Sequence, residues 1–411
     1  MTTYSAVVTT GIYCRPGCGA RPLAQHIAMF GHPAAAEAAG FRACYRCRPY
    51  RVAGPVPATA PELVCAAVQQ IINGALDDGG TEQQLAASIG ISARHLRRLF
   101  GQHLGASPDQ LARSRRAHFA RRLLDDTDLP VLDIAFASGF GSLRQFNRIM
   151  REVFRDAPAS LRKRRHRADR LAADGGLALR LPICPGYDWD AVRTFLAARL
   201  IPGVEQVEGS TYRRTITVAD APGLVEISPG DTNALLLRVH LPYWEGLIHV
   251  VDRVGLLLGV HTDCSAGVSA LLSDQMLGPL IARRPGLVIP GAWNPQELAV
   301  QESLDARPGA LAEFVASHGT PVPGLPGTLT HTLPSQLPGS GADSGTPSEY
   351  VALRQGRRDA FPLEHPCLRA ALADLGLPGP REGWRPWLAL AATHLIAHGD
   401  LLARDRAPAT A

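Results

Sequence analysis

Four cysteines near the start of the chain constrain its fold more than any other feature. Cys14 and Cys18 form a C-x3-C pair, Cys44 and Cys47 form a C-x2-C pair, and 25 residues separate the two pairs. A segment of about 50 residues buries too little apolar surface to be stable without a covalent or metal staple. Four thiolates at this spacing suit a tetrahedral Zn²⁺ site. Spacing alone favours a purely structural zinc site, since most four-cysteine sites are structural.

Composition narrows the class of protein. The chain has 411 residues, of which 46% are hydrophobic and 19% charged, so it is not wholly disordered and can form two to four domains. No apolar stretch is long enough for a membrane helix, and the N-terminus lacks the pattern of a secretory leader. We therefore expect a cytoplasmic protein with no membrane partner. The net charge of +5 favours anionic partners only mildly.

Changes in composition and in hydrophobic periodicity along the chain predict a multidomain α+β protein. A Pro/Ala/Gly-rich run follows the cysteine cluster, helical periodicity comes next, and alternating strand-like segments begin after Gly175-Gly176. Helical patterns return for the last part of the chain. We divide the sequence into residues 1–53 (zinc-bound domain), 54–61 (linker), 62–167 (all-α), 176–245 (α+β) and 246–405 (helical).

Two stretches of the all-α region, 85–100 and 131–154, each predict a helix–turn–helix. Gly90 and Gly139 lie at the turns, and Ser92 and Ser142 are expected N-caps of the second helices. A long helix over about 111–124 bridges the two. Polar side chains on the outer faces and in the basic tail are the candidate DNA contacts: Arg94, His95, Arg97, Arg98, Leu143, Arg144, Gln145, Asn147, Arg148, Lys163 and Arg164. A generic helical bundle with a solvated charged face is the alternative.

The strings Thr9 to Cys18 and Ala38 to Cys47 closely resemble the N-terminal domain of the Ada family. The resemblance implies that Cys14 accepts a methyl group from a methyl phosphotriester in DNA, and that Cys14, Cys18, Cys44 and Cys47 together bind Zn²⁺. The chemistry is consistent, because a zinc-bound cysteine is already deprotonated. Such an activity is a single-turnover transfer to a protein cysteine, since nothing in the scheme regenerates the thiol.

Residues 62–165 resemble an AraC-family DNA-binding domain, most specifically in the order of residues from Ile134 to Arg148. The resemblance implies that the second helix of each motif enters a major groove of double-stranded DNA, with the basic tail on phosphates. RNA polymerase is the expected protein partner of such an activator.

Residues 177–405 resemble the AlkA type of 3-methyladenine DNA glycosylase, which implies a small α+β domain followed by a helix-hairpin-helix domain. The hairpin, Leu337 to Tyr350, lacks the Pro-Trp of the family and carries about three extra residues. His365 stands at the position of the catalytic Asp, with Glu364 beside it; together with Trp387 they mark a glycosylase-like site. A neutral imidazole cannot stabilise a cationic sugar as a carboxylate does. We expect a degenerate domain, in which Glu364 is the one remaining route to catalysis.

Three functions remain open. The first is a transcriptional regulator of the DNA alkylation response, activated by irreversible methyl transfer to Cys14. The second is a repair glycosylase that excises alkylated bases such as 3-methyladenine and uses the front domains for regulation or targeting. The third is a zinc-stabilised DNA-binding protein without methyl transfer, kept open by the short stretch ahead of Thr9.

Overall fold

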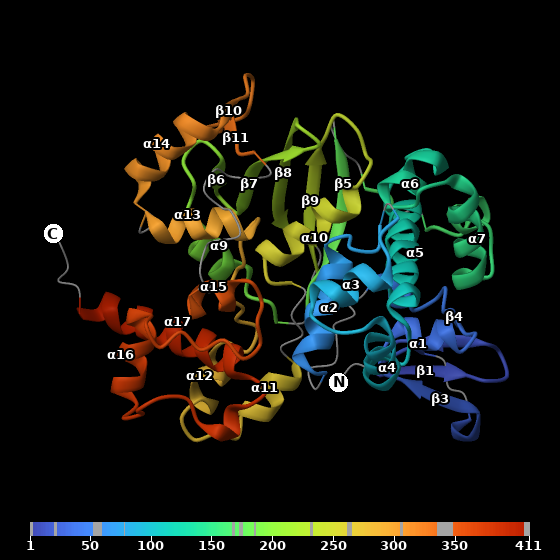
Figure 1. The fold of residues 1–411 in the computed structure, drawn as a ribbon, viewed down its shortest axis with the longest axis horizontal. Helices are drawn as coiled ribbons and strands as arrows, with labels where there is room; N and C mark the ends of the chain where they lie inside the picture. Colours follow the sequence, from blue (N-terminus) through green and yellow to red (C-terminus); the bar gives the residue numbers. More distant parts are fainter. Residues whose placement is uncertain are drawn as a thin grey trace. The chain divides into compact units, whose positions relative to one another are not determined.

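The fold is described from a computed structural model (Figure 1). It describes residues 3–19, 23–51, 60–77, 79–166, 169–171, 176–184, 186–230, 233–260, 265–304, 307–334 and 348–406. The chain forms two compact units: residues 1–182 with 243–252, and residues 183–242 with 253–411. Helices and strands occur in both, so the predicted multidomain α+β class is confirmed.

The first unit begins with a small four-stranded sheet in the order β3-β1-β2-β4. Its strands are β1 (Tyr4–Val7), β2 (Ile12–Cys14), β3 (Ile27–Phe30) and β4 (Arg42–Ala43). Tyr4 and Ala6 of β1 are buried and alternate with more exposed residues, as the period of a strand requires. The short α1 (Pro33–Ala38) follows, and the His32 ring accepts a hydrogen bond from the Ala34 N–H to cap it. Single turns η1 (Ala24–His26) and η2 (Pro49–Arg51) complete this part.

Among the described residues, a series of helices follows in the first unit: α2 (Glu62–Ile72), α3 (Glu82–Ser88), α4 (Ala93–Leu104), α5 (Pro108–Asp126), α6 (Val131–Ala137), α7 (Leu143–Phe154) and α8 (Pro158–Lys163). The central α5 is 19 residues long, which exceeds the predicted 111–124. It begins earlier because Ser107 and Gln110 form a capping box at its start. The strand β5 (Leu177–Pro182) also belongs to this unit.

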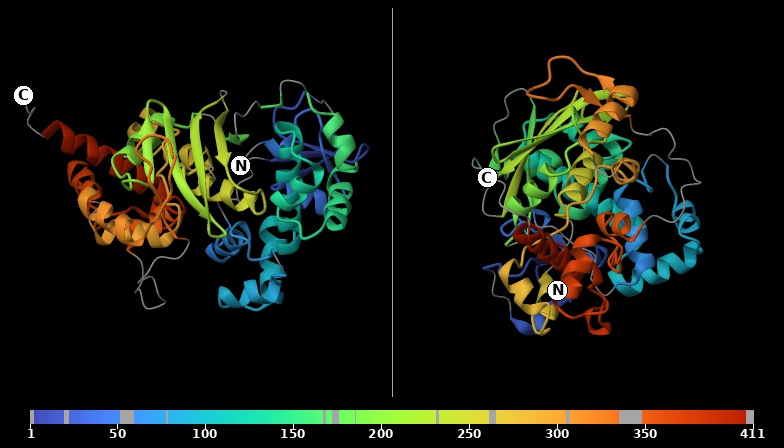
Figure 2. Two further views of the ribbon diagram at one scale, coloured as in Figure 1. Left: turned by 90° about the horizontal axis from the view of Figure 1, so that it is seen from above. Right: turned by 90° about the vertical axis from the view of Figure 1, so that its left-hand side faces the viewer.

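The second unit contains an antiparallel sheet whose strands run in the order β9-β8-β7-β6. Figure 2 shows the longer strands of this sheet side by side in two views. The strands are β6 (Glu205–Glu208), β7 (Thr211–Val218), β8 (Ala221–Pro229) and β9 (Ala234–His240). Leu235, Leu237 and Val239 of β9 are buried at every second position and so place one face of the sheet on the core. The helix α9 (Trp189–Ala197) precedes β6, a strand that the sequence patterns did not predict.

Helices make up most of the remainder: α10 (Leu247–Leu257), α11 (Ser265–Leu271), α12 (Gly278–Arg283), α13 (Pro295–Ser303), α14 (Pro308–His318), α15 (Glu349–Arg354), α16 (Pro366–Asp374) and α17 (Leu388–Arg406). The unit boundary falls within α10. A two-stranded ribbon, β10 (Thr320–Pro321) with β11 (His331–Thr332), and the turn η4 (Glu382–Trp384) complete the list. The helices α16 and α17 lie side by side (Figure 1), and Leu368, Leu395 and the fully buried Trp384 form the core there. The stretch 319–348 is rich in Gly, Pro, Ser and Thr, a composition that predicts a loop, yet its described residues include this short ribbon.

Candidate metal centre and nucleic-acid interface

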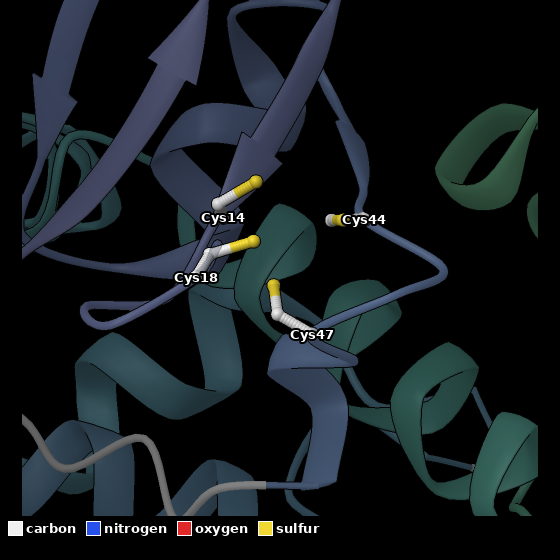
Figure 3. Close-up of side chains that lie close together, drawn as sticks. All are labelled: Cys14, Cys18, Cys44 and Cys47. Carbon is white, nitrogen blue, oxygen red and sulfur yellow. The ribbon is translucent and has the colours of Figure 1, made fainter. Parts of the chain in front are cut away.

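The four cysteines meet because two parallel strands end at the same edge of the small sheet. The strand β2 ends at Cys14 and pairs in parallel with β4, which ends one residue before Cys44. The Cys44 N–H donates to the Tyr13 carbonyl oxygen at 3.0 Å and fixes this register. Cys18 and Cys47 follow in short turns, the first through Gly17 at φ +75°, a value that favours glycine. All four Sγ atoms lie within 4.8 Å of one another and point inward (Figure 3).

The pKa values of the cysteines indicate that the cluster is suited to binding a cation. Burial raises the pKa of Cys14 well above its ordinary value, and the neighbouring Cys47 and Cys44 thiolates raise it further. Burial also raises the pKa of Cys47 to about 12. Burial acts in the same direction on Cys44, but backbone N–H groups of Cys47 and Arg46 that bond to its sulfur bring its pKa below the ordinary value. A divalent ion would offset the repulsion between the sulfurs when they ionise, and a set of four thiolates this close together fits Zn²⁺.

Cys14 differs from the other three cysteines in its burial. Cys14 is 4% exposed, whereas Cys18, Cys44 and Cys47 are half-buried. Exposure therefore does not single out Cys14 as the reactive sulfur, and its assignment depends on the sequence match.

The two helix–turn–helix motifs, α3–α4 and α6–α7, are formed as the sequence predicts. The hydroxyls of Ser92 and Ser142 accept hydrogen bonds from the N–H groups of His95 and Gln145, both at 3.2 Å. Gly90 and Gly139 have φ values of +75° and +76°, which the tight turns between the helices require. The inner faces of α4 and α7 pack into the core through fully buried residues: Leu96, Phe100, Phe146, Ile149 and Phe154.

The candidate DNA contacts differ in how free their side chains are. Eight are exposed: Arg94, Arg97, Arg98, Leu143, Arg144, Arg148, Lys163 and Arg164. His95, Gln145 and Asn147, expected on the outer faces, are half-buried instead. Arg97 pairs with Glu82, and Arg148 pairs with Glu152 at 2.8 Å. Among the described residues, the guanidinium groups of Arg94, Arg98 and Arg144 have no partner, so they can reach DNA without first breaking an ion pair.

Three further candidates have local partners. The Gln145 side-chain oxygen accepts from the Gly141 N–H at 3.3 Å, and the Asn147 amide donates to the Leu143 carbonyl at 3.0 Å. Arg164 donates to Asp156 at 3.0 Å. Their role as DNA contacts remains a prediction, and each must exchange a local hydrogen bond to make it.

Sequence reasoning missed a polar cluster that joins the small sheet domain to α5. Glu37 of α1 accepts hydrogen bonds from the Tyr13 hydroxyl at 2.7 Å and, with Nε2 protonated, from the His118 ring at 2.6 Å. All three side chains are largely buried. Glu37 lies near the end of a short helix, and His118 is 81 residues further along the chain, so no local pattern in a single sequence reveals their contact. We call these three residues the docking cluster.

The glycosylase-like residues Glu364 and His365 are adjacent at the start of α16. His365 is the N-cap residue of α16, its ring centroid lies 4.7 Å from that of Tyr350, and its Nδ1 has no partner among the described residues. Burial, and then the charge of Arg199, lower the pKa of His365, so the ring is neutral at pH 7. The Glu364 carboxylate accepts from the Tyr350 N–H at 3.2 Å at the start of α15.

Trp387 and the hairpin complete that region. Trp387 is half-buried and packs against the core of α16 and α17. Its ring lies so close to the backbone of Gly267 that a Cβ at that position would come within 3.0 Å of it. The changed hairpin of residues 337–347 lies outside the described residues.

Comparison with known families places each region. Residues 2–50 match the metal binding domain of Ada, residues 85–164 match a helix-turn-helix domain, and residues 178–294 match the AlkA N-terminal domain. Across the described residues, no helix is both long and apolar enough to cross a membrane.

Three relatives are informative. A probable bifunctional transcriptional activator/DNA repair enzyme AlkA of Mycobacterium tuberculosis is 34% identical over 95% of this chain and 91% of its own length. The bifunctional transcriptional activator/DNA repair enzyme Ada of Escherichia coli is 34% identical over 29% of this chain and 32% of its own. DNA-3-methyladenine glycosylase 2 of Escherichia coli is 33% identical over 29% and 41%. The first match runs through almost the whole of both chains, so this chain belongs to the family of bifunctional transcriptional activator/DNA repair enzymes that join an Ada-type metal-binding domain to an AlkA-type domain.

Proposed function

We propose that the chain is a transcriptional activator of the DNA alkylation response, and that irreversible transfer of a methyl group from a DNA methyl phosphotriester to Cys14 activates it. One observation carries the proposal: four sulfurs within 4.8 Å of one another lie in the same compact unit as two helix–turn–helix motifs. Double-stranded DNA is the substrate at the first site and the ligand at the second. RNA polymerase is the protein partner that an activator of this kind requires.

The reaction needs no general base. Cys14, Cys18, Cys44 and Cys47 would hold Zn²⁺, which would keep their sulfurs deprotonated and give the site a net charge of −2. The Cys14 Sγ attacks the methyl carbon, an S–C bond forms, and the C–O bond breaks. Its electron pair stays on the phosphate oxygen, so the triester becomes an ordinary diester anion and Cys14 becomes a thioether. No step of this scheme removes the methyl group from Cys14, so each molecule reacts once.

The change of charge supplies the switch. A methylated phosphotriester is neutral, so the anionic site does not repel it as it repels an ordinary phosphate. After transfer the site carries one negative charge fewer beside the DNA polyanion, which strengthens binding. The two reading helices α4 and α7 then hold promoter DNA through successive major grooves.

A label-tracing assay separates this proposal from a purely structural zinc site. Zinc-loaded protein is incubated with duplex DNA that carries radiolabelled methyl groups on its phosphates, and protein-bound label is counted. We expect about one label per chain in the wild type and in Cys65→Ser, the matched control, since Cys65 lies in α2 outside the cluster. Cys14→Ser should take up none. Equal labelling of Cys14→Ser and the control, or undiminished promoter activation by Cys14→Ser in cells exposed to a methylating agent, would refute the proposal.

Excision of alkylated bases is the second candidate function, favoured by the match of residues 178–294 to the AlkA N-terminal domain. The described residues oppose it, because His365 is neutral and Glu364 already accepts a hydrogen bond from the Tyr350 N–H. We infer that this unit has lost base excision. Release of free methylated base from a second duplex, which carries its radiolabelled methyl groups on the bases, would reverse that inference if Glu364→Gln abolished it.

A further inference from the structure

The turn between Cys44 and Cys47 carries a side chain that the proposed chemistry does not use. Tyr45 is half-buried, and its hydroxyl donates a hydrogen bond to the carbonyl oxygen of Phe154, the last residue of α7. A carbonyl at a helix C-terminus has no partner within its own helix. Tyr45 supplies the missing donor from a residue 109 positions away in the sequence.

Two arginines hold the Tyr45 ring in place. The guanidinium carbon of Arg42 lies 4.3 Å from the ring centroid, and that of Arg164 lies 5.2 Å from it. Such contacts are attractive, because the guanidinium charge lies over the electron-rich face of the aromatic ring. Arg164 is the C-cap residue of α8, whereas Arg42 belongs to the small sheet domain. The Tyr45 ring therefore contacts side chains from both the small sheet domain and the helical region.

The same end of α7 has other contacts with the small sheet domain. Arg155, in the left-handed conformation that ends α7, donates to the Gly40 carbonyl at 3.2 Å. The Phe154 ring is fully buried and meets the Tyr50 ring edge-on at 5.9 Å between centroids. The second reading helix thus ends on the segment that carries Cys44 and Cys47.

We propose that Tyr45 is a positioning residue that couples the four-cysteine site to α7, so that the state of the site alters DNA reading by the second helix–turn–helix. This regulation rests on the proposed function, because methylation of Cys14 is the change to be transmitted. Cys44 precedes Tyr45 directly, so any shift of this turn when the ligand set changes moves the donor that holds the end of α7. The coupling is mechanical and local, and it adds to the change of charge.

The test compares Tyr45→Phe, which removes only the hydroxyl, with Tyr187→Phe as the matched control. Tyr187 also donates its hydroxyl to a backbone carbonyl, that of Leu258, at 2.6 Å within the second unit. Full-length zinc-loaded proteins are used, and the probe is a duplex selected from random-sequence DNA by the methylated wild type. Three readouts are taken for each protein: zinc per chain, label fixed on the protein, and hydroxyl-radical footprints before and after methylation.

We expect Tyr45→Phe to bind zinc and accept label as the wild type does. Its gain in DNA affinity on methylation should be smaller by about fivefold, the effect of one hydrogen bond. Protection should weaken in the groove read by α7 and persist in the groove read by α4. Tyr187→Phe should match the wild type. The proposal would be overturned if Tyr45→Phe gained as much DNA affinity on methylation as the wild type and still protected both grooves. That result would leave the methyl-transfer function intact.

A second variant and a second change of state test the same coupling independently. Arg155→Gly removes the contact with Gly40 and suits the φ of +57° at that position, so it should reduce the coupling without weakening the end of the helix. If the wild type fixes no label, the proposed function fails. Zinc removal then replaces methylation as the change of state, and the probe is a duplex selected from random-sequence DNA by the zinc-loaded wild type. Loss of zinc should weaken the α7 footprint of the wild type more than that of Tyr45→Phe, and an equal change in both would refute the coupling.

Discussion

Replacing Glu37 with Gln tests whether the docking cluster holds the small sheet domain on α5. Glu37 accepts from Tyr13 at 2.7 Å and from His118 at 2.6 Å, and the carboxylate side chain is 8% exposed. Hydrogen bonds to a charged group contribute about 1.5–3 kcal/mol, whereas neutral ones contribute about 1 kcal/mol. Removing the charge while keeping the shape should therefore cost about 1 kcal/mol per bond and about 2 kcal/mol in all.

Hydrogen exchange along α5 measures this cost in the full-length protein, where a single unfolding transition is not expected. A loss of about 2 kcal/mol raises the exchange rate of the α5 amides about 30-fold, provided that they exchange through opening of this contact. Glu313→Gln makes the same chemical change at an exposed position of α14 and should leave α5 exchange within about twofold of the wild type. Unchanged α5 exchange in Glu37→Gln would show that the docking cluster does not hold the domain.

The pH dependence of this difference has a defined sign. Burial alone would raise the pKa of Glu37, but the charge of His118 and hydrogen bonds from His118, Ser114 and Tyr13 bring it below the ordinary value. A depressed pKa stabilises the fold fully above the unfolded value of about 4.3 and loses that contribution as the pH falls through the folded value. The difference between Glu37→Gln and the wild type should therefore be fully present at pH 5 and shrink as the pH falls below about 4.

Three further outcomes follow from single contacts. In metal-free protein, the Cys47 pKa of about 12 leaves little thiolate at pH 8, so we expect slow alkylation of Cys47 by iodoacetamide. The alkylation rate, followed by mass spectrometry, should rise about tenfold per pH unit. Ser142→Ala removes the N-cap of α7 and should destabilise that helix by about 1 kcal/mol, which amide hydrogen exchange of α7 measures. Ser303→Ala is the control, because Ser303 is the last residue of α13 and does not cap a helix N-terminus. Arg144→Ala should weaken binding to the selected duplex by about 1–3 kcal/mol in titrations at fixed salt, and more than Arg148→Ala, because Arg148 already pairs with Glu152.

Local features could be predicted because their physical causes lie within a few residues. Ser92 and Ser142 cap helices whose N–H groups are three residues away, and Gly90 and Gly139 form turns within their own segments. The alternation of residues from Ala234 to His240 has the period of a strand and predicts one, and β9 spans that segment. The strand β6, Glu205–Glu208, was missed because two of its four residues are acidic and it has little apolar alternation.

The sequence by itself determined the four-cysteine spacing, the two helix–turn–helix motifs and the family to which the chain belongs. Only the tertiary structure decided which polar groups satisfy one another: Tyr45 at the end of α7, Glu37 with His118, and Glu364 at the start of α15. Tyr45 and Phe154 are 109 residues apart, and Glu37 and His118 are 81 apart. A buried donor takes whatever acceptor the packing of distant elements brings within about 3 Å, and nothing in the residues next to it specifies that choice.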